Sequence, residues 1–313
     1  MKNTMNNRVK LQGYLYEHKL ESKVSGPQSK NPGTPFINGT LDIATDSDMT
    51  NIVSVHFTYV TPTTKSGQAN RTYGVLNDII SGKLKSAMAD GAEVAAKLEV
   101  SAAVDVNDFY TSRNGEEELV SAKRNEGSFV TVISSISSNP RDYNDFDVDM
   151  VINGTRTVEA DEARGLPEKL IIKGCVFNFR KEMKPVEFSV LDPNAISYFE
   201  SLEANVNNPV FTHIRGTQVS TTVVTHVEEA NAFGESYVRD VTSSRKDWVV
   251  NWASAETYLW DDESTITAKE MEKAIADRNV YLAGVKQRRE EYLAAQAGGT
   301  TAPAPASNGG FNF

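Results

Sequence analysis

The segment Lys10-Leu11-Gln12-Gly13-Tyr14-Leu15-Tyr16 decides the predicted fold. Leu11 and Leu15 alternate with polar or aromatic side chains, which is the period of two typical of a β-strand with one buried face. Gly13 stands in the middle of this pattern. A glycine weakens a strand and usually marks a bulge or a sharp bend. The segment therefore predicts a strand that curves tightly enough to close a small barrel.

A second segment, Ile171-Ile172-Lys173-Gly174-Cys175-Val176-Phe177, has a similar pattern, and superposing Gly13 on Gly174 aligns the two. Residues 1–36 and residues 164–184 each carry six basic and two acidic side chains, a net charge of +4. The match is short, and chance similarity between two amphipathic strands is the alternative explanation. The repeat predicts two barrels of one kind.

The rest of the chain up to Trp252 is rich in β-branched residues and short alternating runs, broken by Asn-Gly pairs at 38, 114 and 153. Helical spacing is confined to about 73–81, to 194–204 and to a long C-terminal helix, where Thr267 and Glu270 form a capping box and Ile266 can pack on Met271. We expect a mostly β chain with four parts. These are a first barrel at 1–140, a second barrel at 141–255, an acidic segment and helix at 256–297, and a flexible tail at 298–313.

Composition sets limits on function. The chain has 313 residues, a net charge of −10, a pI near 5.1 and a mean hydropathy of −0.40, with no apolar run of ~20 residues. These values argue against whole-chain disorder, against crossing a membrane and against gripping duplex DNA with the entire surface. The polar start and the single cysteine, Cys175, predict a protein kept in a reducing cytoplasm.

Aromatic side chains next to cations suggest a ligand. On the first strand Tyr14 and Tyr16 share a face with Lys10, away from the apolar side. Nucleic-acid bases stack on such rings and cations neutralise phosphates. For each ring the alternative is burial under a loop or under the C-terminal helix. The residues predicted to bind nucleic acid are Lys10, Tyr14, Tyr16, Lys173, Phe177, Phe179, Phe211, His213, Arg215, Lys246 and Trp248.

Sequence motifs of common enzymes are missing: the chain has no phosphate loop, dinucleotide fingerprint, Gly-x-Ser-x-Gly or His-Glu-x-x-His. Asp145, Asp147 and Asp149 alternate, but Met150 and Arg156 stand where a calcium loop needs glycine and glutamate, so we expect a solvated strand face instead. We predict no enzymatic activity, no metal and no cofactor.

The chain resembles the single-stranded DNA-binding proteins of bacteria and their phages, which are built on the oligonucleotide-binding (OB) barrel. The opening Asn7–Leu15 looks like the first strand of that family, and Phe211–Gly216 looks like its strand after the helix. The Gly/Pro/Ala tether that ends in Phe313 resembles its partner-binding tail. Two features depart from the family: Ser307–Phe313 lacks the usual acidic side chains, and the chain is long enough for two barrels.

The resemblance implies two tandem OB-like Greek-key barrels that coat single-stranded DNA, without sequence preference, during replication or recombination of a phage genome in the host cytoplasm. RNA is the other possible nucleic acid. Phe311 and Phe313 would dock replication or recombination proteins. The alternative is a virion structural or assembly protein that uses the barrels for protein contacts, and an enzyme with an unrecognised site comes third. The oligomeric state stays open.

Overall fold

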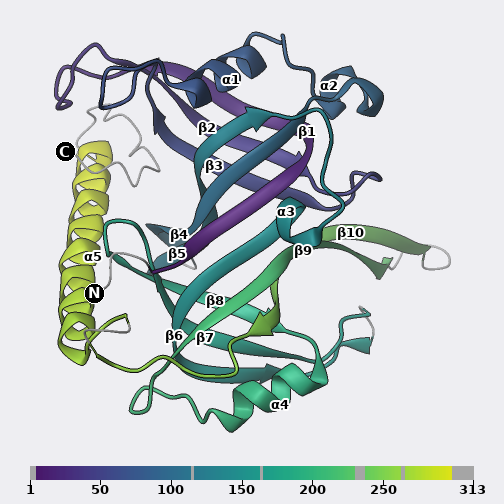
Figure 1. Ribbon diagram of the computed structural model, residues 1–313, viewed down its shortest axis with the longest axis vertical. Helices are drawn as coiled ribbons and strands as arrows, with labels where there is room; N and C mark the ends of the chain where they lie inside the picture. The colour runs from purple at the N-terminus through teal and green to yellow at the C-terminus, as the bar shows by residue number, and fades with distance from the viewer. Residues whose placement is uncertain (1–4, 114–115, 163–164, 230–236, 262–264, 298–313) are drawn as a thin grey trace.

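The first half of the chain forms five strands whose pairings close on themselves (Figure 1). The protein is seen as a computed structural model that describes residues 5–113, 116–162, 165–229, 237–261 and 265–297. Hydrogen bonds join the strands in the order β2-β3-β5-β4-β1, and β1 also pairs with β2. We call this group the first closed sheet. Its strands are β1 (Asn7–Val24), β2 (Pro35–Ala44), β3 (Ile52–Val60), β4 (Lys97–Arg113) and β5 (Glu116–Val132).

The second half repeats this order. The pairing runs β6-β7-β8-β10-β9 and returns from β9 to β6, which makes a second closed sheet. In each closed sheet the third and fifth strands pair in parallel, and a helix lies between the third and fourth strands. These helices are α1 (Arg71–Ile80) and α4 (Pro193–Ser201). The strands are β6 (Asn144–Val158), β7 (Lys169–Phe177), β8 (Met183–Val190), β9 (Val210–Glu229) and β10 (Tyr237–Ala253).

The predicted superposition of Gly13 on Gly174 is wrong, because it aligns two strands that do not correspond. By strand order β1 corresponds to β6, whereas Gly174 lies on β7, the second strand of its closed sheet. Both glycines nevertheless allow the first and second strands to approach. A Cβ added at Gly13 would collide with the carbonyl oxygen of Ala44 on β2, and one at Gly174 with that of Val151 on β6. The expectation of a bulge is confirmed for β1, where the register shifts between Leu15 and Glu17. Near Gly174 the shift lies on the opposite strand, β6, between Ile152 and Gly154.

The apolar core is continuous across both closed sheets. Val9, Leu11 and Leu15 on β1 are fully buried, and they belong to the same cluster as Phe146 and Phe188 of the second closed sheet. Backbone pairing makes the continuity possible, since residues 7–11 of β1 pair with residues 144–148 of β6. The two closed sheets therefore share a strand-to-strand seam.

Each closed sheet has one long hairpin that contacts the other closed sheet; these hairpins are β4–β5 and β9–β10. In the hairpin of the first closed sheet, Asp105 on β4 forms an ion pair with Lys184 at 3.1 Å. The Lys123 ammonium of the same hairpin lies 4.7 Å from the centre of the Phe188 ring. In the hairpin of the second closed sheet, β9 places Gln218 against Asn125, and the two buried side-chain amides exchange hydrogen bonds of 2.9 and 3.0 Å. The seam is thus held from both sides.

The C-terminal helix α5 (Ala268–Ala297) runs along one side of the molecule (Figure 1). The predicted capping box is confirmed: Glu270 N–H donates to Thr267 Oγ1 at 3.2 Å, and Thr267 N–H donates to Glu270 Oε2 at 3.1 Å. Ile266 is fully buried, with Met271 packed against the same cluster. The remaining helical turns are α2 (Ala87–Asp90), the 3-10 turn η1 (Ala92–Val94) and α3 (Pro140–Tyr143).

The prediction of a mostly β chain with a C-terminal helix is confirmed. The helices expected near 73–81 and 194–204 are found as α1 and α4. Among the described residues, none of the helices is both long and apolar enough to cross a membrane. The tail at 298–313, with Phe311 and Phe313, lies outside the described residues.

Candidate nucleic-acid interface

A hollow of about 320 Å³ lies on the outer side of β2 and β3. Pairing sets Thr40 on β2 directly opposite His56 on β3, and Lys19 on β1 opposite Thr40, so the three side chains form a row across three strands. The hairpin of β4 and β5 adds the far wall. The lining residues are Thr40, Ser54, His56, Asn107, Ala122 and Arg124.

Two buried nitrogen atoms behind the wall of this hollow lack a hydrogen-bond partner within the described part of the chain. They are His56 Nε2 and Arg124 Nε. Burial, and then the charge of Arg124, lower the pKa of His56 to about 4, so its imidazole is neutral at pH 7. Arg124 pairs with Glu126 at 2.9 Å, and burial raises the pKa of that carboxyl. The hollow offers a neutral imidazole beside a guanidinium.

Lysines stand at both edges of the hollow. Lys19 is exposed on β1. Lys246 is exposed on β10 of the second closed sheet, and its Nζ donates to Ser54 Oγ at 3.0 Å. This contact brings the predicted residue Lys246 to the rim of the hollow, although it lies almost two hundred positions away from Ser54 in the sequence. Cations from β1, β5 and β10 therefore surround one polar hollow.

The predicted residues of β1 lie on its outer side but are partly covered. Lys10 pairs with Asp142 at 3.1 Å and with Glu99 at 3.5 Å, and the hydrogen bond to Asp142 raises the pKa of Lys10. Asp142 belongs to the connection between the two closed sheets, so Lys10 fastens that connection. Tyr14 and Tyr16 are half-buried, and the Lys97 ammonium lies 5.8 Å from the centre of the Tyr14 ring.

The expectation that Phe177, Phe211 and Trp248 present solvated rings is wrong. Phe177 and Phe211 are buried in a second apolar cluster with Ile266, just before α5, so the alternative of a cover from the C-terminal part is confirmed for both. Trp248 points inward and packs on Phe146, with ring centres 5.6 Å apart. A base cannot stack on a ring whose faces are already filled.

Phe179 and Lys173 remain accessible. The Phe179 side chain is 86% exposed between β7 and β8, with the Arg180 guanidinium 5.1 Å from its centre. Lys173 on β7 is half-buried and pairs with Glu187 at 3.4 Å. The second closed sheet thus exposes one aromatic ring at the end of its second strand, while the middle of that strand is neutralised.

His213 and Arg215 belong to a balanced network of charges. His213 lies 2.7 Å from Asp149 and 3.1 Å from Asp147, and Arg215 lies 2.8 Å from Asp145. Hydrogen bonds to Asp147 and Asp149 raise the pKa of His213 to about 9, so it is charged at pH 7. The expectation of a solvated aspartate face is therefore wrong, because these carboxylates are buried by the basic side chains that neutralise them.

His56, Arg124 and Lys19 were not predicted from the sequence. A signal existed for His56, since Ser54 and His56 alternate with buried Val53, Val55 and Phe57 and must face outward. Arg124 gave none, because it reaches the hollow only through the pairing of β3 with β5, which cannot be inferred from local pattern.

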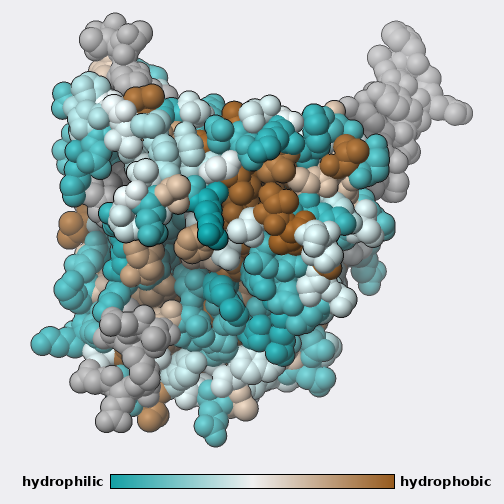
Figure 2. All heavy atoms as spheres, turned by 45° about the horizontal axis from the view of Figure 1, so that its top comes forward, coloured by the Kyte–Doolittle hydropathy of each residue, from teal (hydrophilic) through white to brown (hydrophobic). Residues whose placement is uncertain are grey.

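Other chemistry finds little support. Among the described residues no cluster of histidine, cysteine, aspartate and glutamate side chains could hold a metal ion. Cys175 is buried, and burial raises the pKa of its thiol to about 12, which disfavours a nucleophilic role. The face shown in Figure 2 is mainly hydrophilic, with an apolar patch on the side of the first closed sheet.

The chain was compared with family models, curated proteins and solved structures. No family model matches the chain, and no curated protein does. Among solved structures, the chain is similar to a deletion mutant of the single-stranded DNA-binding protein from Thermus aquaticus. The TM-score is 0.45 at 10% identity, over 83% of this chain and 98% of that chain. The relation is structural and distant.

Proposed function

We propose that this protein binds single-stranded DNA without sequence preference and that each closed sheet is an OB-like barrel. The observation that carries the proposal is the strand order, which is repeated in both halves: five strands close on the first, with a helix between the third and fourth. The OB fold is a five-stranded Greek-key barrel that binds oligonucleotides on the face of its second and third strands. In the first closed sheet those strands are β2 and β3, which form the hollow.

The two barrels would bind DNA unequally. On β7 of the second closed sheet, the outward-facing side chains of Cys175 and Phe177 are buried beneath the segment around Ile266 and α5. The corresponding face of the first closed sheet is open at the hollow. We therefore assign the main DNA site to the first barrel, with Phe179 as an additional stacking ring on the second.

A physical mechanism follows from the side chains present. Lys19, Arg124 and Lys246 would neutralise successive phosphates, and the neutral His56 imidazole would contact a base or sugar inside the hollow. The chain as a whole carries a net charge of −10, which would repel DNA that does not reach this face. The site would accept any base, because backbone contacts carry no sequence information.

The division into barrels at 1–140 and 141–255 and a role in replication or recombination are parts of the same proposal. In it, Phe311 and Phe313 of the 298–313 tail would dock a protein partner. Deleting residues 298–313 should then leave DNA binding unchanged while abolishing capture of replication or recombination proteins. Loss of DNA binding on this deletion would contradict the separation of roles.

The test is fluorescence anisotropy with labelled dT30, measured across salt and compared with a duplex of equal length and with U30. We expect tight binding to dT30 that weakens with salt, and much weaker binding to duplex. Arg124→Gln and Lys19→Gln should each weaken binding and lower the salt slope by about 0.7. Lys269→Gln, an exposed lysine on α5, is the matched control and should leave both unchanged.

Circular dichroism of Arg124→Gln is needed alongside, because the substitution leaves Glu126 without its cation. Absence of dT30 binding by the unmodified protein at low salt would overturn the proposed function. If neither Lys19→Gln nor Arg124→Gln changed the affinity for dT30, the assignment of the site would be overturned.

A further inference from the structure

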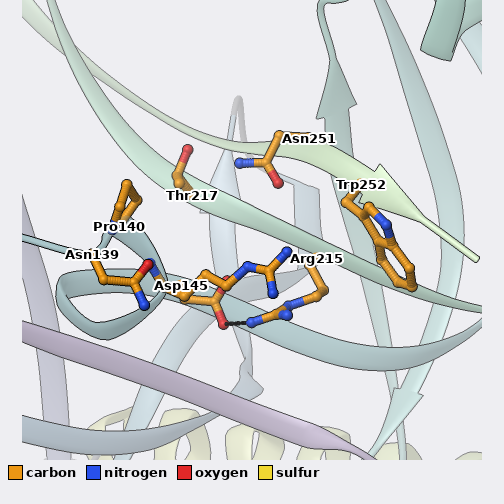
Figure 3. A pocket seen from close by; sticks show the side chains of 8 residues that line it. Asn139, Pro140, Asp145, Arg215, Thr217, Asn251 and Trp252 are labelled. Atoms are coloured by element: carbon orange, nitrogen blue, oxygen red, sulfur yellow. Dashed lines mark hydrogen bonds and ion pairs between the residues drawn. The ribbon is translucent and has the colours of Figure 1, made fainter.

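A second hollow of about 200 Å³ lies where α3 meets the second closed sheet (Figure 3). It is separate from the face of β2 and β3, since its walls come from α3, β6, β9 and β10. Figure 3 shows Arg215 reaching toward Asp145, with Asn251 and Trp252 contributed by β10. The lining residues are Asn139, Pro140, Arg141, Asp145, Arg215, Thr217, Asn251 and Trp252.

A β-bulge aims Trp252 into this hollow. Along β10, Trp248 and Val250 point inward, and strict alternation would bury residue 252 as well. The register shifts between Val250 and Trp252, so that Val250 pairs with Gly216 but Trp252 pairs with Arg215. Asn251 is the extra residue. The bulge turns the indole to the outer side, where it is 45% exposed, and such re-aiming of a side chain is typical of functional bulges.

The indole contacts the His213 ring. The centre of the His213 imidazole lies 5.4 Å from that of Trp252, with the ring planes at 73°. His213 is itself fixed by Asp147 and Asp149. The contact is T-shaped, and 45% of the Trp252 surface stays exposed beside it. An exposed tryptophan on a rigid support loses little freedom when a second ring stacks on it.

The charge beside the indole is positive. Arg8, His213 and Arg215 are matched by Asp145, Asp147 and Asp149, three cations to three carboxylates. Arg141 lies outside this balance: it is exposed, lines the hollow, and no ion pair is found for it within the described residues. The hollow therefore joins a partly exposed indole to one guanidinium without an ion pair among the described residues.

We propose that this hollow is a second nucleotide site, in which one base stacks on Trp252 and the adjoining phosphate pairs with Arg141. The inference rests on the proposed single-stranded DNA binding and deepens it, because it assigns a contact outside the face of β2 and β3. Asn251 and Thr217 supply polar groups at the walls that suit any base edge. The site takes a base with its phosphate, since the indole and the guanidinium each satisfy one part of a nucleotide.

Two measurements with dT30 test the site. The first is anisotropy with Trp252→Ala and Arg141→Gln, for which we expect affinity to fall about five- to a hundredfold for the lost stack and less for the lost cation. Trp260→Phe is the control, because Trp260 packs against the apolar cluster of Ile266 and Ala274 and does not line the hollow. The second uses Trp248→Phe/Trp260→Phe, a variant with Trp252 as its single tryptophan. Its fluorescence should be quenched by dT30 and protected from acrylamide when DNA is bound.

The results separate this site from the proposed function. If the unmodified protein binds dT30 but Trp252→Ala binds equally well and the single-tryptophan variant is not quenched, the second site is overturned while the function stands. If the unmodified protein does not bind dT30, both are overturned. Quenching of Trp252 together with weakened binding of Trp252→Ala supports both.

Discussion

Arg278 on α5 and Asp108 on β4 form a buried ion pair, with 2.7 Å between Nη2 and Oδ1. The arginine side chain is 8% exposed and the aspartate side chain is fully buried. A second bond joins Nη1 to Oδ2 at 3.2 Å, so the pair is bidentate. The C-terminal helix is therefore fastened to the hairpin of the first closed sheet rather than only to the second closed sheet that precedes it in the chain.

Arg278→Gln is expected to destabilise the protein by about 3–5 kcal/mol, because it leaves the Asp108 carboxylate buried without a cation. Urea unfolding measures the loss. The control is Arg289→Gln, which breaks the exposed pair between Arg289 and Glu117 and should change stability little. Equal effects of the two substitutions would show that burial of the first pair does not matter.

Gly13→Ala is expected to cost at least about 2 kcal/mol, because the new Cβ would meet the backbone of Ala44, which cannot move aside without opening the pairing of β1 with β2. Gly154→Ala places the same methyl group in open space and serves as the control. Thermal unfolding followed by circular dichroism distinguishes them. A normal midpoint for Gly13→Ala would contradict the close approach of the two strands.

His213 should contribute a pH-dependent part of the stability. Its pKa is about 9 in the folded protein and near 6.5 when unfolded, so its contribution is complete below pH 6.5 and is lost as pH rises through 9. The difference in unfolding free energy between the unmodified protein and His213→Gln should shrink by on the order of 3 kcal/mol from pH 6 to pH 10.

This difference is the quantity to follow, because Lys123 acts in the opposite direction. Burial lowers its pKa to about 7, so its contribution grows more favourable as pH rises from 7 toward 10. Urea unfolding of both proteins across pH gives the difference directly. A difference that stays constant with pH would mean that His213 is not charged in the folded state.

The amide pair of Asn125 and Gln218 should couple the two closed sheets. Gln218→Leu leaves the buried Asn125 amide without its partner and is expected to cost about 1–3 kcal/mol. Asn125→Leu should cost a similar amount, while the double substitution should cost less than the two together. Urea unfolding of the four proteins gives the coupling energy. Strict additivity would indicate that the pair does not hold the seam.

Local pattern predicted the elements better than their partners. Alternation and the glycine in Lys10–Tyr16 predicted β1 and its bend, and the capping box at Thr267 and Glu270 predicted the start of α5. These features depend on neighbours in sequence. The correspondence between β1 and β6 could not be predicted, because the short match between residues 10–16 and 171–177 aligned two strands with different positions in the order.

The site was predicted least well for residues whose exposure depends on tertiary packing. Phe177 and Phe211 have the alternation of exposed stacking rings, but the chain returns around Ile266 to cover them. Trp252 shows the reverse, since only the bulge at Asn251 takes it out of the core pattern. Each outcome depends on a tertiary contact or on one inserted residue, neither of which leaves a periodic signal.

The seam between β1 and β6 has a mechanical consequence. Val9, Lys10 and Leu11 pair with β4 on one side and with β6 on the other, so a single strand serves both halves and no flexible tether separates them. Domains joined by a loose linker can bind a polymer together or one at a time, and their footprint changes with conditions. Here the spacing is built into the backbone ladder, and the protein should cover a fixed length of its ligand at low and high salt alike.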